Sequence, residues 1–367
     1  MAKSKHLTVA GWLAAASLFL LAGCGGGDSG GCPPTAVPGT STAATQSYVW
    51  PGDDWEVSTP EAEGMDAGRL EEVATYCQAH GCRAVVIVRH GRIAWERYWG
   101  GWNKDSTDNS WSMAKSVTSA LVGIAIGEGK IESVDQSAAD FIQEWRGTDR
   151  EKITLRNLLS MTSGLSWTMM YAPPSGDTVQ MLGSGDAVGY AVSRPLYREP
   201  GSDWYYSDGD AETFSRILKV ATGMEAGEYA QQELFGPIGI KGATWQTDKL
   251  GQTITLCCVF TSARNFARFG YLFLRDGRWG DKQVVPEEWV RESIQPSQSE
   301  NIQYGYYWWL LDLPDVPKDM FSALGFQTKR VYVIPSLDLV AVRLGEGDKE
   351  WSDNDFLKPI VEAVTNS

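Results

Sequence analysis

The spacing of apolar residues along the chain predicts helices that lie between two groups of strands. β-rich runs at 83–89 and 92–99, split by His90-Gly91, are typical of a hairpin, and two more runs lie at 330–334 and 339–344. Apolar residues at helical spacing occur at 67–78, 115–128, 155–161, 211–221 and 263–274. This order predicts an α/β (α+β) fold: an antiparallel sheet flanked by helices, with a mostly helical subdomain at about 134–255.

A further apolar run, 7–21, indicates export rather than folding. Lys3 and Lys5 precede it, and Leu21-Ala22-Gly23-Cys24 follows it. Charge, apolar run and small residues in this order are typical of a signal peptide, and the run is short for a membrane span. The cysteine makes 1–23 look like a bacterial lipoprotein signal, which predicts lipid on Cys24 and a protein anchored in the cell envelope. An ordinary signal peptide is the alternative.

Composition then divides the rest of the chain. The stretch after Cys24 consists of Gly, Ser, Pro, Thr and Ala with almost no large apolar residue, so 24–54 is predicted to be a flexible tether. From Trp55 onward the chain is rich in large apolar residues, which predicts a folded domain over 55–367 of roughly 310 residues. The net charge of −14 repels phosphate backbones and anionic lipids. A small molecule is therefore the expected partner, nucleic acid is not, and membrane contact is expected only through the lipid.

The cysteines fit an oxidising compartment. Cys77 and Cys82 bracket Gln-Ala-His-Gly, and this spacing predicts a small disulfide loop. Cys257 and Cys258 lie in an apolar run, where buried thiols are expected. Zinc is the competing idea for the first pair, but no second cysteine pair has metal spacing and the only histidines are His6, His80 and His90. Neither a metal nor a cofactor is expected.

The scarcity of histidine also excludes a Ser-His-Asp triad of the usual kind, because no histidine lies in a nucleophile setting. Ser112-Met113-Ala114-Lys115 offers another base: on a helix, positions i and i+3 share a face. The helix dipole and burial would lower the pKa of Lys115 toward that of a usable base. The alternative is that Ser112 only caps the helix and Lys115 is solvated. Lys115 comes directly before the uncharged run 116–127. Burial of a lysine there is costly unless it has a function, and this favours a catalytic role.

Two other segments are weak evidence for a function when each is taken alone. The segment 200–210 offers a phenol and a hydroxyl next to an acid in a turn, which by itself fits a helix cap with surface tyrosines. Ala323-Leu324-Gly325-Phe326 comes just before the late strands, where a glycine allows close approach of a backbone or ligand.

Together and in this order, these elements resemble the serine β-lactamase and penicillin-binding-protein superfamily. The likeness runs from about Trp55 to the C-terminus and is greatest to the branch of class C β-lactamases, family VIII esterases, D-Ala-D-Ala carboxypeptidases and 6-aminohexanoate-dimer hydrolases. The stretches that carry it besides the first motif are Leu158-Leu-Ser-Met-Thr-Ser-Gly-Leu165, Pro200-Gly…Tyr206-Ser-Asp208, Ser262-Ala-Arg-Asn-Phe-Ala-Arg-Phe-Gly270 and Tyr304-Gly-Tyr-Tyr-Trp-Trp309.

The resemblance implies roles for single residues. Ser112 and Lys115 match the Ser-x-x-Lys motif as nucleophile and base. Tyr206 matches the tyrosine of the Tyr-x-Asn motif, which relays the proton, and Asp208, where that motif has Asn, is a candidate substrate-binding residue. Reading the segment as Ser-Asp-Asn would make Ser207 the relay instead.

The third motif, usually Lys-Thr-Gly or His-x-Gly, is Ala323-Leu324-Gly325 in this chain. Gly325 is a candidate substrate-binding residue, and the backbone N–H groups of Ser112 and Phe326 would form the oxyanion hole. The basic residue that holds the substrate carboxylate in β-lactamases is absent, which argues against hydrolysis of penicillins.

The expected function is therefore that of a serine hydrolase, which cleaves an amide or ester through an acyl-enzyme on Ser112. Two alternatives stay open. One is a β-lactamase or D-Ala-D-Ala carboxypeptidase, and the other is an inactive envelope binding protein with the same fold.

Overall fold

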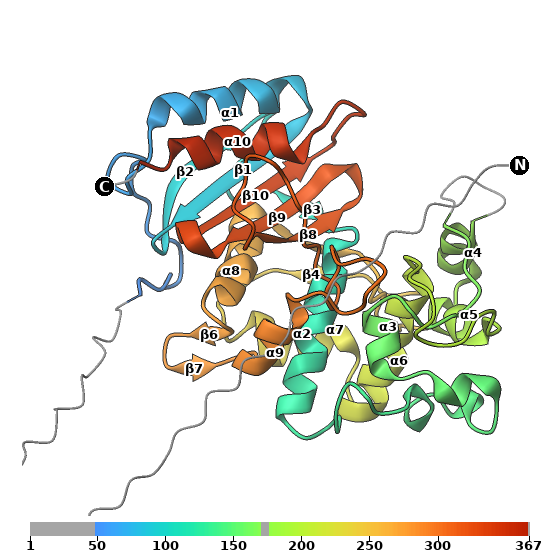
Figure 1. The fold of residues 1–367 in the computed structure, drawn as a ribbon. Coiled ribbons are helices and arrows are strands. Elements are labelled where there is room, and N and C mark those ends of the chain that lie inside the picture. The colour runs from blue at the N-terminus through green and yellow to red at the C-terminus, as the bar shows by residue number, and fades with distance from the viewer. Residues whose placement is uncertain (1–47, 170–175, 366–367) are drawn as a thin grey trace, which may run out of the picture. The chain divides into compact units, whose positions relative to one another are not determined.

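A five-stranded antiparallel sheet organises the protein. The computed structural model describes residues 48–169 and 176–365, so the predicted signal peptide, Cys24 and most of the tether lie outside the described residues. The strand order is β2-β1-β10-β9-β8 (Figure 1). The strands are β1 (Cys82–Arg89), β2 (Arg92–Tyr98), β8 (Phe321–Gly325), β9 (Lys329–Ile334) and β10 (Leu339–Gly345). The antiparallel sheet flanked by helices is thus confirmed, and the first hairpin pairs with strands from the other end of the chain.

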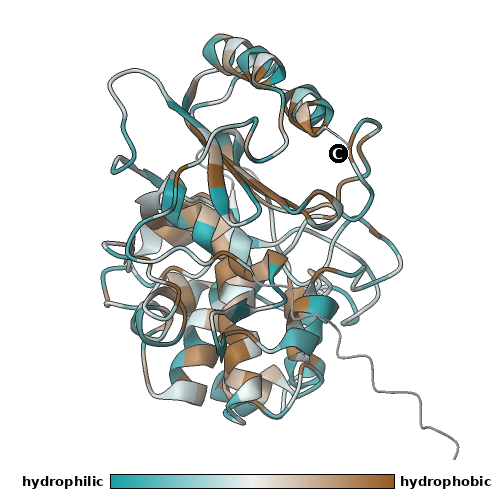
Figure 2. Cartoon of the chain, turned by 90° about the vertical axis from the view of Figure 1, so that its left-hand side faces the viewer, coloured by the Kyte–Doolittle hydropathy of each residue, from teal (hydrophilic) through white to brown (hydrophobic). Residues whose placement is uncertain are grey.

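Both faces of the sheet are covered, and this explains why its central strands are apolar throughout. In β1, Val85 and Ile87 point into one core and Val86 and Val88 into the other, because side chains alternate along a strand. Helices α1 (Ala67–Ala79) and α10 (Asp353–Ala363) cover the first face, and α8 (Ala263–Leu274) covers the second (Figure 1). Figure 2 shows hydrophobic colour on the strands between these helices and also on the helices below the sheet.

The chain between β2 and α8 is mainly helical. The segment 134–255 contains α3 (Leu155–Leu159), α4 (Asp177–Ser184), α5 (Ala187–Ser193), α6 (Asp208–Thr222), α7 (Ala226–Ala230) and the short strand β4 (Thr244–Trp245). Beside it β4 pairs with β5 (Val259–Ser262), which pairs with β3 (Thr107–Asn109). After α8 come β6 (Arg278–Trp279), β7 (Lys282–Gln283) and α9 (Glu287–Ser293).

Helix α2 (Met113–Gly127) lies between the sheet and the helical part (Figure 1). Every residue from Met113 to Ala125 is buried, as its uniform apolar pattern predicts. Every helix and strand that the sequence pattern predicts is present, with ends shifted by a few residues. Within 48–169 and 176–365, no helix has the length and apolar character that crossing a bilayer requires.

The folded part begins before residue 55, so the predicted end of the tether is wrong. The ring of Trp50 contacts those of Tyr271 and Trp279. The Gly52 carbonyl accepts a hydrogen bond from Arg268, and the Asp54 carboxylate pairs with Arg264 at 2.9 Å. A single large apolar side chain and these polar contacts are enough to pack 48–54 against the domain.

Both predictions about the cysteines are wrong as well. Cys77 and Cys82 are buried free thiols rather than a disulfide. The Cys82 sulfur instead accepts a hydrogen bond from the Nε of buried Arg343 at 3.3 Å, which gives the thiol a polar partner. Cys257 and Cys258, expected as thiols, form a disulfide between adjacent residues. Sequence spacing alone therefore did not identify the pair.

Candidate active site

Ser112 stands at the N-terminus of α2, directly after a residue in an unusual conformation. Trp111 has a φ of +46°, which is rare for a bulky residue. Its N–H donates to Oδ1 of Asn109 at 2.9 Å, and its indole N–H donates to Gln327 at 3.2 Å. These bonds hold the turn, as strained residues near reacting groups require. The Ser112 side chain makes no capping hydrogen bond to the helix, so it does not have the role that the alternative interpretation gave it.

Lys115 lies one turn further along α2 and contacts Ser112, as the i, i+3 spacing predicts. The Lys115 Nζ donates to Ser112 Oγ at 3.0 Å, to Asp208 Oδ1 at 2.7 Å and to the Leu256 carbonyl at 3.1 Å. Lys115 is only 1% exposed, so it is not a solvated lysine. Three acceptors match the three donors of an ammonium group.

The protonation of Lys115 differs from the sequence-based expectation. Burial by itself lowers its pKa, but the Asp208 carboxylate and Tyr206 outweigh burial and raise the pKa above the ordinary 10.5. The expected lowering was wrong because residue 208 is an aspartate that forms a buried ion pair with Lys115. The resting site therefore holds the lysine as an ammonium group.

Hydrogen bonds from two side chains fix the orientation of the Asp208 carboxylate. Its Oδ1 accepts from Lys115, and its Oδ2 accepts a 2.7 Å hydrogen bond from the hydroxyl of Thr178 on α4. The sequence offered Asp208 as a candidate substrate-binding residue, and that expectation stays a prediction. The structure adds an ion pair with Lys115 at 2.7 Å. Thr178 and the Leu256 carbonyl were missed, because no local pattern marks a residue that approaches Ser112 from a distant segment.

The structure also places the two candidate relay residues. The Tyr206 ring centroid is 5.1 Å from the Lys115 Nζ, and the ring stacks on Trp309. Ser207 is the N-cap of α6, where its hydroxyl accepts from the Asp210 N–H at 3.1 Å. Tyr206 thus lies against Lys115, while the Ser207 hydroxyl is directed to the start of its own helix.

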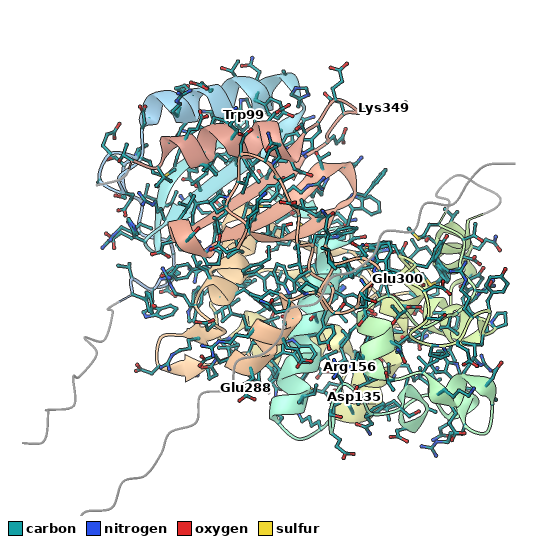
Figure 3. All side chains as sticks on the ribbon, in the orientation of Figure 1. Trp99, Asp135, Arg156, Glu288, Glu300 and Lys349 are labelled. Atoms are coloured by element: carbon teal, nitrogen blue, oxygen red, sulfur yellow. A yellow bond between two sulfur atoms is a disulfide. The ribbon has the colours of Figure 1, made fainter. Side chains whose placement is uncertain are left out.

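The segment that carries Tyr206 is fixed by a loop that follows α9. Glu300, labelled in Figure 3, accepts a hydrogen bond from the Trp204 N–H. The Trp204 ring lies edge-on to Tyr304 and Trp309. Trp309 and Tyr304 both contact the Tyr206 ring. The side chains of Tyr304, Tyr306, Tyr307 and Trp308 are buried in the core.

The end of β8 approaches Ser112 from the opposite side. A Cβ on Gly325 would lie 2.3 Å from the Ser110 carbonyl oxygen, so only glycine lets β8 pack this closely against the turn before Ser112. Phe326 follows, and its ring packs edge-on against Trp111. The structure therefore brings Ser112, Gly325 and Phe326 together.

Two buried cations hold the turn after Phe326, where Gln327 and Thr328 both have positive φ. The guanidinium of Arg343 donates to both of their carbonyl groups, at 2.9 and 3.1 Å. The Lys329 Nζ donates to the Gln327 side chain at 3.2 Å and pairs with Asp108 at 3.2 Å. Strained residues at the rim of the site are thus stabilised from inside the protein.

A pocket of about 360 Å³ opens over Ser112. Its walls combine apolar groups with few polar ones, and the lining residues are Trp111, Ser112, Thr178, Val179, Leu182, Asp208, Leu256, Cys257 and Phe326. No lysine or arginine belongs to this lining in the described part of the chain. Within residues 48–169 and 176–365 there is also no cluster of three or more His, Cys, Asp or Glu side chains suited to a metal ion.

The first two turns of α6 bury three acids, and one of them gives a prediction about stability. Burial raises the pKa of Asp210 to about 7, although hydrogen bonds from Ser163 and Ser207 act in the other direction. In the unfolded chain this carboxyl ionises near 3.8. Between these two pH values the folded state binds a proton that the unfolded chain has lost. The free energy of unfolding should therefore fall as pH rises from about 4 to about 7.

Asp210→Asn, which resembles the protonated acid, should flatten this decline. Urea unfolding at pH 5 and pH 8 measures it, with Asp281→Asn on an exposed turn as the control. An unchanged slope in the Asp210→Asn variant would show that Asp210 is ionised in the folded protein.

Comparison with known proteins agrees with the fold. The family model described as Beta-lactamase matches residues 63–363. An uncharacterized protein of Alkalihalophilus pseudofirmus is 25% identical over 71% of this chain and 82% of its own length. The 6-aminohexanoate-dimer hydrolase of Paenarthrobacter ureafaciens is 22% identical over 78% of this chain and 75% of its own. A solved family VIII carboxylesterase superposes with a TM-score of 0.66 at 14% identity, over 84% of this chain and 98% of that one.

Proposed function

The chain belongs to the β-lactamase family of serine hydrolases, and from this premise we propose that it cleaves an amide or ester through an acyl-enzyme on Ser112. The observation that carries the proposal is the contact of Lys115 with Ser112 at 3.0 Å, inside a buried polar network at the base of a pocket. A nucleophile, a base and a space for substrate meet at one helix N-terminus.

The proposed reaction has two halves. Lys115 must first lose the proton that it carries in the resting site. In its neutral form, which alkaline pH favours, it accepts the Ser112 proton while Oγ attacks the carbonyl carbon, and the N–H groups of Ser112 and Phe326 bind the oxyanion. Tyr206 relays the proton that Lys115 has accepted to the departing amine or alcohol, so that Lys115 is neutral again and the acyl group stays on Ser112. Water then attacks the ester carbonyl with the same groups acting in reverse, which releases the acid and restores Ser112.

The pocket lining supports an uncharged, apolar acyl group as the substrate. Trp111, Val179, Leu182 and Phe326 offer apolar surface, and a substrate carboxylate would find no cationic side chain among the lining residues described above. The related protein of Paenarthrobacter is named as a hydrolase of the 6-aminohexanoate dimer, and the solved structure as a carboxylesterase. We therefore favour an esterase or amidase over a β-lactamase or D-Ala-D-Ala carboxypeptidase.

Active-site labelling tests the proposal directly. A fluorophosphonate should label the wild-type protein on Ser112 and should not label Ser112→Ala, as read by peptide mass spectrometry. A panel of neutral p-nitrophenyl esters and anilides should be hydrolysed faster than nitrocefin. Turnover of nitrocefin above that of the esters would favour the β-lactamase, and no labelling at all would favour the inactive binding protein.

Replacement of the two relay candidates separates the alternative readings of the second motif. Tyr206→Phe should lower turnover of an anilide by about 10² or more, because amine leaving groups require protonation, and it should affect an activated ester much less. Ser207→Ala should be mild on both. A larger loss with Ser207→Ala on the anilide would assign the relay to Ser207.

We also propose that a lipid on Cys24 anchors the protein in the cell envelope, on the support of Leu21-Ala22-Gly23-Cys24. Cys24→Ala should move the protein from the membrane fraction to the soluble fraction while esterase activity is retained. A wild-type protein without lipid at its N-terminus would contradict this.

A further inference from the structure

The disulfide between Cys257 and Cys258 lies beside the Ser112–Lys115 pair. Cys257 lines the pocket over Ser112, and Cys258 lines a second pocket of about 420 Å³. The two pockets share Trp111 and Leu182. The disulfide thus lies where the two pockets adjoin, and it joins neighbouring residues rather than distant parts of the fold.

The residue before the disulfide makes a direct contact with the proposed base. The Leu256 carbonyl accepts the third hydrogen bond of Lys115, at 3.1 Å. Ser112 and Asp208 contact Lys115 through side chains, whereas Leu256 does so through its backbone. The position of this carbonyl oxygen therefore depends on the conformation of the backbone around residue 256.

That backbone is fixed on both sides. The Leu256 N–H donates to the carboxyl group of buried Glu212 at 3.2 Å. The Cys257 carbonyl accepts from the indole of Trp245 at 2.8 Å, and the Cys258 carbonyl accepts from the Gln246 N–H at 3.0 Å. Cys258 itself has a φ of +77°, a conformation that a residue with a side chain rarely adopts.

We propose that the Cys257–Cys258 disulfide is a positioning element of the active site, which holds the Leu256 carbonyl against Lys115 and forms a rigid wall of the pocket. The covalent ring keeps two successive residues in one conformation, so the left-handed backbone at Cys258 does not relax. The carbonyl dipole then directs Lys115 toward Ser112, as preorganised groups do in active sites. This inference rests on the hydrolase function proposed above.

Reduction of the wild-type full-length protein tests the proposal without any substitution. Dithiothreitol transfers two electrons and two protons to the disulfide and becomes its own cyclic disulfide, and alkylation followed by mass spectrometry verifies two new thiols at Cys257 and Cys258. We expect kcat for a small p-nitrophenyl ester to fall about tenfold. Loss of the carbonyl dipole should also move the acid limb of the pH profile to lower pH.

The double variant Cys257→Ser/Cys258→Ser should show the same two changes and should not respond to dithiothreitol. The lack of response to dithiothreitol controls for the other cysteines, because a loss of activity caused by their reduction would still occur in the double variant. Unchanged kcat and pH profile in reduced wild type would overturn the proposal. So would a change in melting temperature with no shift of the pH profile, because that is the result of a purely structural role.

The two proposals fail in distinguishable ways. If the wild-type protein does not react with a fluorophosphonate in its oxidised form, the hydrolase function fails. If it reacts and hydrolyses esters equally well in both redox states, only the role of the disulfide fails.

Discussion

Ser112→Ala and Lys115→Ala should each reduce hydrolysis of a neutral ester by roughly 10³-fold or more, because both residues act in one catalytic unit. Their effects should not add, so the double variant should be no slower than either single one. Steady-state rates with one p-nitrophenyl ester measure this, and Lys130→Ala, just beyond the other end of the same helix, is the matched control.

Lys115→Ala alone leaves the Asp208 carboxylate buried without its cation, which by itself destabilises proteins by about 3–5 kcal/mol. The variant Lys115→Ala/Asp208→Asn removes this charge and separates loss of folding from loss of chemistry. Near-normal turnover by a folded Lys115→Ala protein would rule out the Ser-Lys mechanism.

Asp208→Asn should shift the acid limb of the pH profile of kcat/KM to lower pH. The base must be neutral, and the Asp208 carboxylate raises the pKa of Lys115, so the wild-type rate should rise toward alkaline pH. Removing the negative charge should lower that pKa, and the limb should move by about one to three pH units. This substitution also restores the residue that the related motif carries at this position.

The measurement is kcat/KM for one neutral ester between pH 5 and pH 10, with exposed Asp149→Asn as the control. Over this range the wild-type rate should still be rising at pH 10, whereas the Asp208→Asn rate should begin to level off at a lower pH. An unmoved acid limb would show that another group sets it. Repeating the profile with Tyr206→Phe identifies that group if it is the phenol.

Local patterns predicted the framework of the site. The uncharged run after Lys115 could only be a buried helix, and the i, i+3 spacing placed Lys115 next to Ser112, as the 3.0 Å contact shows. The β-rich runs near both ends of the folded part likewise predicted the sheet.

Contacts between distant segments were beyond such patterns. Asp208 is 93 residues from Lys115 in sequence, and nothing in either segment shows that they form an ion pair. The direction of the Lys115 pKa shift depends on that pair and was therefore predicted wrongly. The cysteines show the same limit, because Arg343, which contacts Cys82, lies 261 residues away from it.

The pairing of β1 with β10 makes the protein depend on its whole chain for folding. Helix α2, which begins directly after Ser112, is synthesised early, yet the strand that completes the sheet beside β1 ends at Gly345. Until then the β1–β2 hairpin has an unpaired edge and exposed apolar faces, and contacts between such distant segments form slowly. The catalytic centre should consequently appear late and cooperatively, so that shortened or nascent chains are inactive and prone to aggregation until β10 is available.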